Sequence, residues 1–333
     1  MSYQFDFRSY QRKFNRPLQT SHGVWSIRQG IIIRLTDKSG KFSLGEIAPI
    51  SWLGSESFDE ALDFCSQLPV KITEEMIFSI PTELPTCQFG FESAWENIQA
   101  LIQNSLPPWE AKIKNQYSGL LPSGAAALQV WQTLWNQGYR TFKWKIGVGE
   151  IEDELKVFEQ LIPAMIEMQS LAFLRLDANG GLSYGNACKW LQVCDNIGCN
   201  NKLTLNIEFL EQPLPINQFK GILELRDRYS TPIALDESVA TLNQMQECYH
   251  QGWRGIFIIK PCIAGSPLKL RQFCQTHKID AVFSSVFETK IGKQYALNLA
   301  AELSCNDRAL GFGVNHWFDE DEETWLKHLW QNI

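Results

Sequence analysis

The chain has 333 residues, which at about 150 residues per domain predicts roughly two domains. Its 37 acidic and 30 basic residues give a net charge of −7. This charge argues against a general nucleic-acid partner, because phosphate contacts need clustered lysine and arginine. With 44% hydrophobic and 20% charged residues, the composition is that of a globular protein with a sizeable core.

Neither a secretory signal nor a membrane span is visible in the sequence. Residues 1–12 contain Asp6, Arg8 and Arg12 and lack the apolar core of a signal peptide. No apolar run approaches the roughly 20 residues that span a bilayer. We therefore expect no membrane partner. The nine cysteines include no C-x-x-C pair, so we expect them to be reduced thiols in a cytoplasmic protein.

The first part of the chain, residues 1–87, predicts an α+β domain. Residues 30–35 (GIIIRL) and 41–47 have the apolar and β-branched composition of strands, and the D-K-S-G turn between them predicts a hairpin. Apolar residues at helical spacing predict a helix over residues 57–68. The P-T-E-L-P stretch at 81–85 is typical of a domain boundary.

From about residue 88 to residue 311, short apolar strands alternate with helices. We expect strands at residues 118–123, 139–146, 172–179, 206–213, 232–238, 255–262, 281–285 and 309–311. The clearest helical segments between them are 152–166, 184–197 and 267–277. Repeated βα units predict a parallel sheet, and eight strands favour a closed barrel. An open doubly wound sheet is the alternative, but no G-x-G-x-x-G follows a strand, so a dinucleotide-binding enzyme is disfavoured.

Five successive predicted strands end in ionisable residues. These residues, in chain order, are Lys143 and Lys145, Asp177, Glu211, Asp236 and Lys260. Successive groups are between 24 and 34 residues apart, which is one βα unit, so each step advances one strand around the barrel. Active sites of such barrels are built at the carboxyl ends of the strands.

The alternation of side chains along a strand supports this grouping. Lys143 and Lys145 are two residues apart and share a face, as do Arg175 and Asp177. Glu208 and Glu211 are three apart, so we expect them on opposite faces, with only Glu211 in the group.

The chemistry of the group favours a metal site. Three carboxylates repel one another and need a cation, and oxygen ligands without histidine or cysteine suit Mg²⁺. A magnesium ion at Asp177, Glu211 and Asp236 can hold a substrate carboxylate and stabilise the charge left when its α-proton is removed. The ammonium group of Lys143 and the metal would both favour the neutral form of Lys145, which a base requires. A ring of structural ion pairs is the alternative interpretation.

The sequence contains K-x-K, followed in order by D-A-N, E-Q-P, D-E-S and I-K-P. These motifs resemble those of the enolase superfamily in its muconate-lactonizing branch, and the match extends over nearly the whole chain. The resemblance implies a modified TIM barrel, (β/α)₇β, over residues 88–311, preceded by an α+β capping domain. It also implies that the tail, residues 312–333, packs back on the cap. The use of a lysine base with Mg²⁺ is known for this superfamily.

Three segments resemble the o-succinylbenzoate synthase family more narrowly. They are residues 14–23 (FNRPLQTSHG) followed by 45–49 (GEIAP), residues 87–94 (CQFGFESA), and Ser284-Ser285 with Glu288. The resemblance implies a lyase of menaquinone or phylloquinone biosynthesis. Its substrate would be a small dicarboxylate, 2-succinyl-6-hydroxy-2,4-cyclohexadiene-1-carboxylate, which loses water to give 2-succinylbenzoate. Mg²⁺ would be the cofactor, and Mn²⁺ could replace it.

The same resemblance implies roles for individual residues. Lys145 would abstract the α-proton and then assist departure of hydroxide. Lys260 would stabilise the enediolate from across the barrel, and Lys143 would bind the metal-bound carboxylate. Ser284 and the backbone at Gly311 would position the succinyl tail. A further residue, Arg175, would lie behind the metal ligands or form a core ion pair, and cap segments 20–25 and 51–55 would close the mouth.

Other functions on the same barrel stay open. N-succinylamino-acid racemases, dipeptide epimerases and muconate cycloisomerases also use paired lysines with Mg²⁺. Residues 311–314 (GFGV) lack the acidic pair typical of dipeptide epimerases, and strand 7 carries Phe283-Ser284-Ser285 where racemases of the mandelate type have a histidine base. His22, in the cap, is a candidate substrate contact. A non-catalytic binding module would not need Lys145 and Lys260. The sequence does not indicate an oligomeric state.

Overall fold

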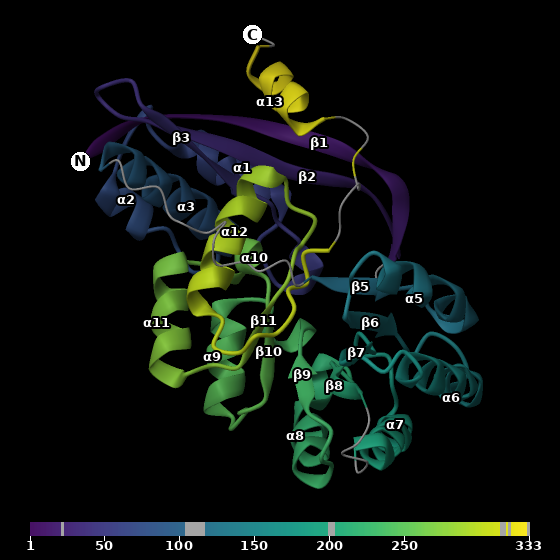
Figure 1. Cartoon of the computed structure of the whole chain (residues 1–333). Coiled ribbons are helices and arrows are strands. Elements are labelled where there is room, and N and C mark those ends of the chain that lie inside the picture. The colour runs from purple at the N-terminus through teal and green to yellow at the C-terminus, as the bar shows by residue number, and fades with distance from the viewer. Residues whose placement is uncertain (21–22, 104–116, 199–203, 314–317, 319–320, 332–333) are drawn as a thin grey trace.

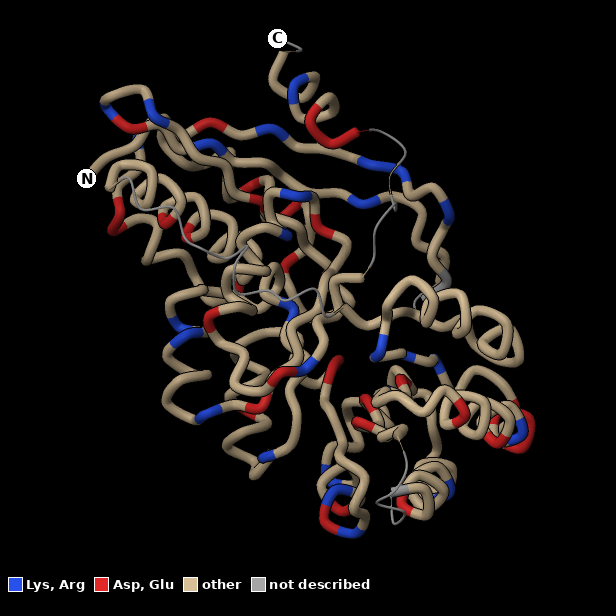
Figure 2. Tube along the Cα trace, viewed as in Figure 1, with Lys and Arg blue, Asp and Glu red and all other residues tan. Residues whose placement is uncertain are grey.

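The computed structural model describes residues 1–20, 23–103, 117–198, 204–313, 318 and 321–331. It consists of an antiparallel sheet with its own helices, which lies over one end of a parallel barrel (Figure 1). Among the described residues, no helix is both long and apolar enough to cross a bilayer. Basic and acidic residues are spread over both parts (Figure 2).

The cap is a four-stranded antiparallel sheet in the order β3-β2-β1-β4. Its strands are β1 (Ser2–Thr20), β2 (Gly23–Thr36), β3 (Phe42–Ile47) and β4 (Lys71–Thr73), and its helices are α1 (Phe58–Gln67), α2 (Glu74–Phe78) and α3 (Pro85–Ile102). The predicted hairpin corresponds to β2 and β3. The long strand β1 was not predicted, because its many charged residues obscure the apolar alternation of Tyr3, Phe5 and Phe7.

The second sheet contains seven parallel strands in the order β11-β10-β9-β8-β7-β6-β5. They are β5 (Ser118–Leu121), β6 (Thr141–Lys145), β7 (Ala172–Asp177), β8 (Leu205–Glu211), β9 (Ile233–Leu235), β10 (Ile256–Ile259) and β11 (Ala281–Phe283). Parallel bridges from Tyr117 to Leu310 and from Ser284 to Gly311 join its two edges to one segment. This segment acts as the eighth strand and closes the barrel, so the predicted (β/α)₇β fold is confirmed.

Helices cover the outside of the barrel (Figure 1). They are α5 (Ala127–Asn136), α6 (Ile151–Ile166), α7 (Tyr184–Gly198), α8 (Phe219–Arg228), α9 (Leu242–His250), α11 (Pro267–His277) and α12 (Lys290–Leu303). The short helix α10 (Pro261–Ala264) directly follows β10 and is buried against α3. Short 3₁₀ turns occur at Ser51–Leu53, Gly124–Ala126, Ile216–Gln218 and Glu237–Val239. The barrel interior is filled by a small apolar cluster of Phe209, Ala234, Ile256, Ile258 and Val282.

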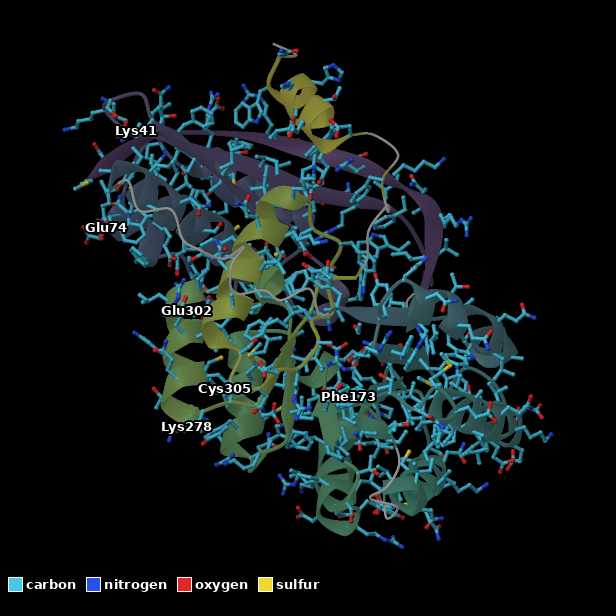
Figure 3. All side chains as sticks on the ribbon, in the orientation of Figure 1. Lys41, Glu74, Phe173, Lys278, Glu302 and Cys305 are labelled. Carbon is cyan, nitrogen blue, oxygen red and sulfur yellow. The ribbon has the colours of Figure 1, made fainter. Side chains whose placement is uncertain are left out.

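The cap lies over the carboxyl ends of the strands. Phe173, at the start of β7, and Lys278, just before β11, lie on the side of the molecule away from Lys41 and Glu74 of the cap (Figure 3). The opposite ends of the same strands therefore face the cap. This arrangement places the candidate residues at the interface of the two parts.

Helix α3 connects the two parts. Phe91, Ala94 and Ile98 belong to the apolar core of the cap, whereas Phe89 belongs to the core of the barrel. The expected boundary at 87/88 falls inside this continuous helix. We therefore propose that the cap extends through α3.

The last described helix, α13 (Glu322–Gln331), lies on β1 (Figure 1). Arg12 forms an ion pair with Glu322 at 3.1 Å, and the ring of Trp325 packs edge-on against Tyr10 with 5.2 Å between centroids. The guanidinium groups of Arg8 and Arg34 lie over Trp330. Of the tail expected on the cap, residues 312–333, we propose on this basis that α13 belongs to the capping domain, whereas Phe312 packs in the core of the barrel.

Candidate active site

The strand register places the predicted polar residues side by side. Lys145 on β6 is paired with Asp177 on β7, and Asp177 is paired with Glu211 on β8. Asp236 directly follows β9, and Lys260 directly follows β10. The five residues therefore lie at the carboxyl ends of five adjacent strands. Lys145 and Lys260 are four strands apart, on opposite sides of the ring of eight.

A cavity of about 350 Å³ lies between the cap and this end of the barrel. All nine predicted site residues line it, namely Lys143, Lys145, Arg175, Asp177, Glu211, Asp236, Lys260, Ser284 and Gly311. The sequence prediction thus identified residues that the structure brings together around one space.

The upper wall of the cavity is apolar. The cap contributes Leu18, Trp25 and Trp52, and the barrel contributes Phe287. The ring of Trp25 packs edge-on against Trp52, at 5.1 Å, and against Phe287, at 5.6 Å between centroids. Both cap segments expected at the mouth thus reach the cavity, whereas His22 lies outside the described residues.

Two of the three lysines are paired with carboxylates. Lys143 Nζ lies 2.8 Å from both Asp177 Oδ2 and Glu211 Oε1. Lys260 forms an ion pair with Asp236. Lys145 Nζ has no ion pair or hydrogen bond with any described residue. Lys145 is therefore the lysine whose nitrogen is available to a substrate.

Burial changes the acid–base properties of these groups. It lowers the pKa of Lys260 to about 8, an effect that the negative charges of Glu211 and Asp177 oppose. For Lys143 burial also disfavours the charged form, but the carboxylates of Asp177 and Glu211 outweigh it and raise the pKa. Burial, followed by the charge of Asp177, raises the pKa of Glu211. Carboxylates this crowded require nearby cations to remain ionised together.

The side chain of Gln212 fixes the backbone around the carboxylates. Its Oε1 accepts from the backbone N–H groups of Asp236 and Ser238, at 3.0 and 3.2 Å, and its Nε2 donates to Ser238 Oγ at 2.8 Å. Its own backbone has a φ of 37°, a left-handed conformation that is strained for a residue other than glycine. The prediction missed this positioning role, although Gln212 is the Q of the E-Q-P motif.

Glu208 holds Arg175 at the floor of the cavity, although Glu208 was expected to face away from the candidate site. Its Nε donates to Glu208 Oε2 at 2.7 Å, and Arg308 contacts the other oxygen of Glu208 at 2.8 Å. The register between β7 and β8 shifts after Leu174, and this bulge turns Glu208 toward Arg175. Simple alternation predicted that Glu208 and Glu211 face opposite sides of the sheet. Because of the bulge they face the same side, so this prediction was wrong.

Ser284 and Gly311 meet where the barrel closes. Ser284 Oγ donates to the carbonyl oxygen of Gly311 at 3.3 Å. A side chain at position 311 would collide with Ser284, so glycine is needed for this approach. Glu288 accepts hydrogen bonds from Ser285 Oγ and from the backbone of Val286, at 3.0 and 2.6 Å, and holds the loop that follows β11.

No group of three histidine, cysteine, aspartate or glutamate side chains has the spacing of a metal site within the described ranges. The lysine ammonium groups lie between the carboxylates instead. The oxygen atoms nevertheless belong to buried carboxylates at the ends of adjacent strands.

The comparisons with known proteins agree with this geometry. A family model described as "Enolase C-terminal domain-like" matches residues 126–328. An o-succinylbenzoate synthase of Thermosynechococcus vestitus is 38% identical over 337 aligned residues, which cover 99% of each protein. The chain belongs to the enolase superfamily.

Solved structures of the superfamily share the fold. The o-succinylbenzoate synthase of Thermosynechococcus elongatus BP-1, described as having magnesium in its active site, matches with a TM-score of 0.87 and 36% identity, over 99% of this chain and 100% of that one. The L-Ala-D/L-Glu epimerase of Bacillus subtilis matches with a TM-score of 0.76 and 21% identity, over 96% and 91% of the two chains. The second likeness, at this low identity, concerns the superfamily fold alone.

Proposed function

We propose that this member of the enolase superfamily is an o-succinylbenzoate synthase, a lyase that requires Mg²⁺. It would remove water from 2-succinyl-6-hydroxy-2,4-cyclohexadiene-1-carboxylate and release 2-succinylbenzoate. The observation that carries the proposal is that Lys145 has no ion-pair partner in the described part of the chain and faces Lys260 across three buried carboxylates. The full-length similarity to synthases of this type supports the choice among reactions.

The residues present fit a hard divalent cation. Asp177, Glu211 and Asp236 provide oxygen ligands from three adjacent strands, and all three are at least 94% buried, with 6%, 1% and 5% of their surfaces exposed. A carboxylate cluster of this kind is costly without a cation. When bound there, Mg²⁺ would act as a Lewis acid for a substrate carboxylate.

The lysines would move the proton. Lys145, in its neutral form, would take the α-proton of the ring, and the electron pair of the broken C–H bond would form the new double bond. The resulting ammonium group would return the proton to the departing hydroxide, so that water leaves from the same face. Lys260, on the opposite side of the ring, would place a positive charge against the developing negative charge.

The rest of the cavity would hold the second carboxylate and the ring. Ser284, the backbone at Gly311 and the guanidinium group of Arg175 offer polar contacts for the succinyl tail. Trp25, Trp52 and Phe287 would cover the ring and exclude water. Lys143, which contacts both Asp177 and Glu211, would bind the ring carboxylate near the metal.

Racemisation of N-succinylamino acids is the second candidate. Two lysines on opposite sides of the cavity could remove and return a proton on either face, and an N-succinylamino acid racemase of Thermus thermophilus is 26% identical over 55% of this chain. A preference for the dehydration would require that the cavity place the substrate hydroxyl next to Lys145.

Purified protein with Mg²⁺ is expected to dehydrate the cyclohexadiene substrate, because the site provides a base, an opposing cation and carboxylates for the metal. The ultraviolet change on aromatisation measures the rate, and exchange of the α-proton of N-succinylamino acids in D₂O measures the competing reaction. Dehydration should be the faster reaction by at least tenfold in kcat/KM. No dehydration with either Mg²⁺ or Mn²⁺ would overturn the proposal, and faster racemisation would favour the second candidate.

A further inference from the structure

Two polar side chains at the edge of the cavity have no role in the reaction proposed above. Asn179 is the last residue of the D-A-N motif after β7, and Glu237 is the middle residue of the D-E-S motif after β9. Both line the cavity. Asn179 lies two residues after Asp177, and Glu237 lies one residue after Asp236.

Asn179 and Glu237 are joined to each other and to the carboxylates. Asn179 Nδ2 donates to Glu237 Oε1 at 3.0 Å, and the backbone N–H of Asn179 donates to Asp177 Oδ1 at 3.1 Å. Strand β8 lies between β7 and β9, so the contact between the two side chains spans the end of the strand that carries Glu211. The hydrogen bond thus joins the loops after β7 and β9 past the end of β8.

The second carboxylate oxygen of Glu237, Oε2, is the feature that indicates a ligand. Glu237 Oε2 is buried and has no hydrogen-bond partner among the residues that the structure describes. Glu237 directly follows Asp236 in the chain, and Asn179 joins it to Asp177. A buried carboxylate oxygen without a partner is strongly unfavourable unless a cation or a donor satisfies it. The nearby lysine ammonium groups, at Lys143 and Lys260, are already paired with other carboxylates.

We propose that Glu237, oriented by Asn179, is a fourth carboxylate of the metal site. Its unpartnered oxygen contributes negative charge to the cation that Asp177, Glu211 and Asp236 hold, and Asn179 fixes its direction through the other oxygen. This inference rests on the metal site of the proposed function, and it does not depend on the identity of the substrate. If Glu237 served only to anchor the loop, its charge would have no effect on metal binding.

Binding of Mn²⁺ alone to the full-length protein tests the inference. The free-ion signal in electron paramagnetic resonance gives the Kd of Mn²⁺, and competition gives that of Mg²⁺. Glu237→Gln keeps the shape and the hydrogen bond from Asn179 but removes the charge, and it is expected to raise both Kd values at least tenfold. Glu247→Gln, an exposed change on α9, is the matched control and should leave them within twofold.

A second variant separates orientation from folding. Asn179 has a φ of 43°, in the left-handed region that favours glycine, so Asn179→Gly removes the side-chain donor without adding backbone strain. We expect Asn179→Gly to raise the Kd of Mn²⁺ about threefold and to have no further effect in the Glu237→Gln background. An unchanged near-ultraviolet circular dichroism spectrum confirms that each variant is folded.

The outcomes distinguish this inference from the proposed function. A Kd within twofold of the wild-type value for folded Glu237→Gln overturns the role of Glu237, whatever the catalytic activity. Wild-type protein that binds no Mn²⁺ overturns the metal site altogether. Wild-type protein that binds Mn²⁺, loses that binding in Glu237→Gln and fails to dehydrate the cyclohexadiene overturns only the proposed function and supports the inference.

Discussion

Replacing Lys145 by alanine is expected to lower kcat for the dehydration by about 10³-fold or more, the range in which removal of a general base acts. The reason is that Lys145 is the lysine in the cavity whose nitrogen has no ion-pair partner among the described residues, whereas Lys143 and Lys260 are paired with carboxylates. Single-turnover kinetics with saturating Mg²⁺ measures the effect.

Metal binding provides the control for this variant. Because Lys145 forms no ion pair with the carboxylates, Lys145→Ala should bind Mn²⁺ with a Kd within twofold of the wild-type value. Lys143→Ala should alter that Kd, since Lys143 bridges Asp177 and Glu211. Residual activity above a tenth of the wild-type rate in Lys145→Ala would mean that another residue is the base.

Glu46→Ala is expected to lower the free energy of unfolding by about 3 kcal/mol, since it removes a buried charged acceptor from several donors at once. Glu46, on β3 of the cap, is fully buried. It accepts from Tyr10 Oη at 2.5 Å, from Thr289 Oγ1 at 2.6 Å and from the backbone of Gly292 at 3.0 Å. The contacts with Thr289 and Gly292 join the cap to the amino-terminal end of α12 on the barrel.

Urea unfolding monitored by tryptophan fluorescence measures this change. Glu302→Ala is the matched control, because Glu302, on α12, also accepts a charged hydrogen bond, from Arg271 Nε at 2.8 Å, but its side chain is 42% exposed. We expect a loss below about 1 kcal/mol for the control. A loss of the same small size for Glu46→Ala would show that Glu46 does not hold the cap on the barrel.

The residues at the strand ends could be predicted because the signals that mark them are local. A charged residue at the end of an apolar strand, repeated once in each βα unit, needs only the spacing of Asp177, Glu211 and Asp236 to be recognised. Parallel strands then bring these ends to one edge without further information. The same logic placed Lys143 and Lys145 on one face.

Other features depend on contacts that no local pattern reveals. The bulge that turns Glu208 toward Arg175 arises from the pairing of β7 with β8, so the alternation rule failed there. The apolar wall brings together Trp25, Trp52 and Phe287 from three distant parts of the chain. The direction of Glu237 depends on its hydrogen bond to Asn179 across the intervening strand.

The central claim is that the polar residues at the mouth of the barrel form one site for a metal and a dicarboxylate. A crystal structure of the protein with Mg²⁺ and 2-succinylbenzoate tests it most directly. The ring carboxylate and Asp177, Glu211 and Asp236 should share one magnesium ion, with the succinyl tail toward Ser284 and Gly311. Electron density for the ligand or the metal elsewhere, with these carboxylates still bound only to lysines, would contradict the claim.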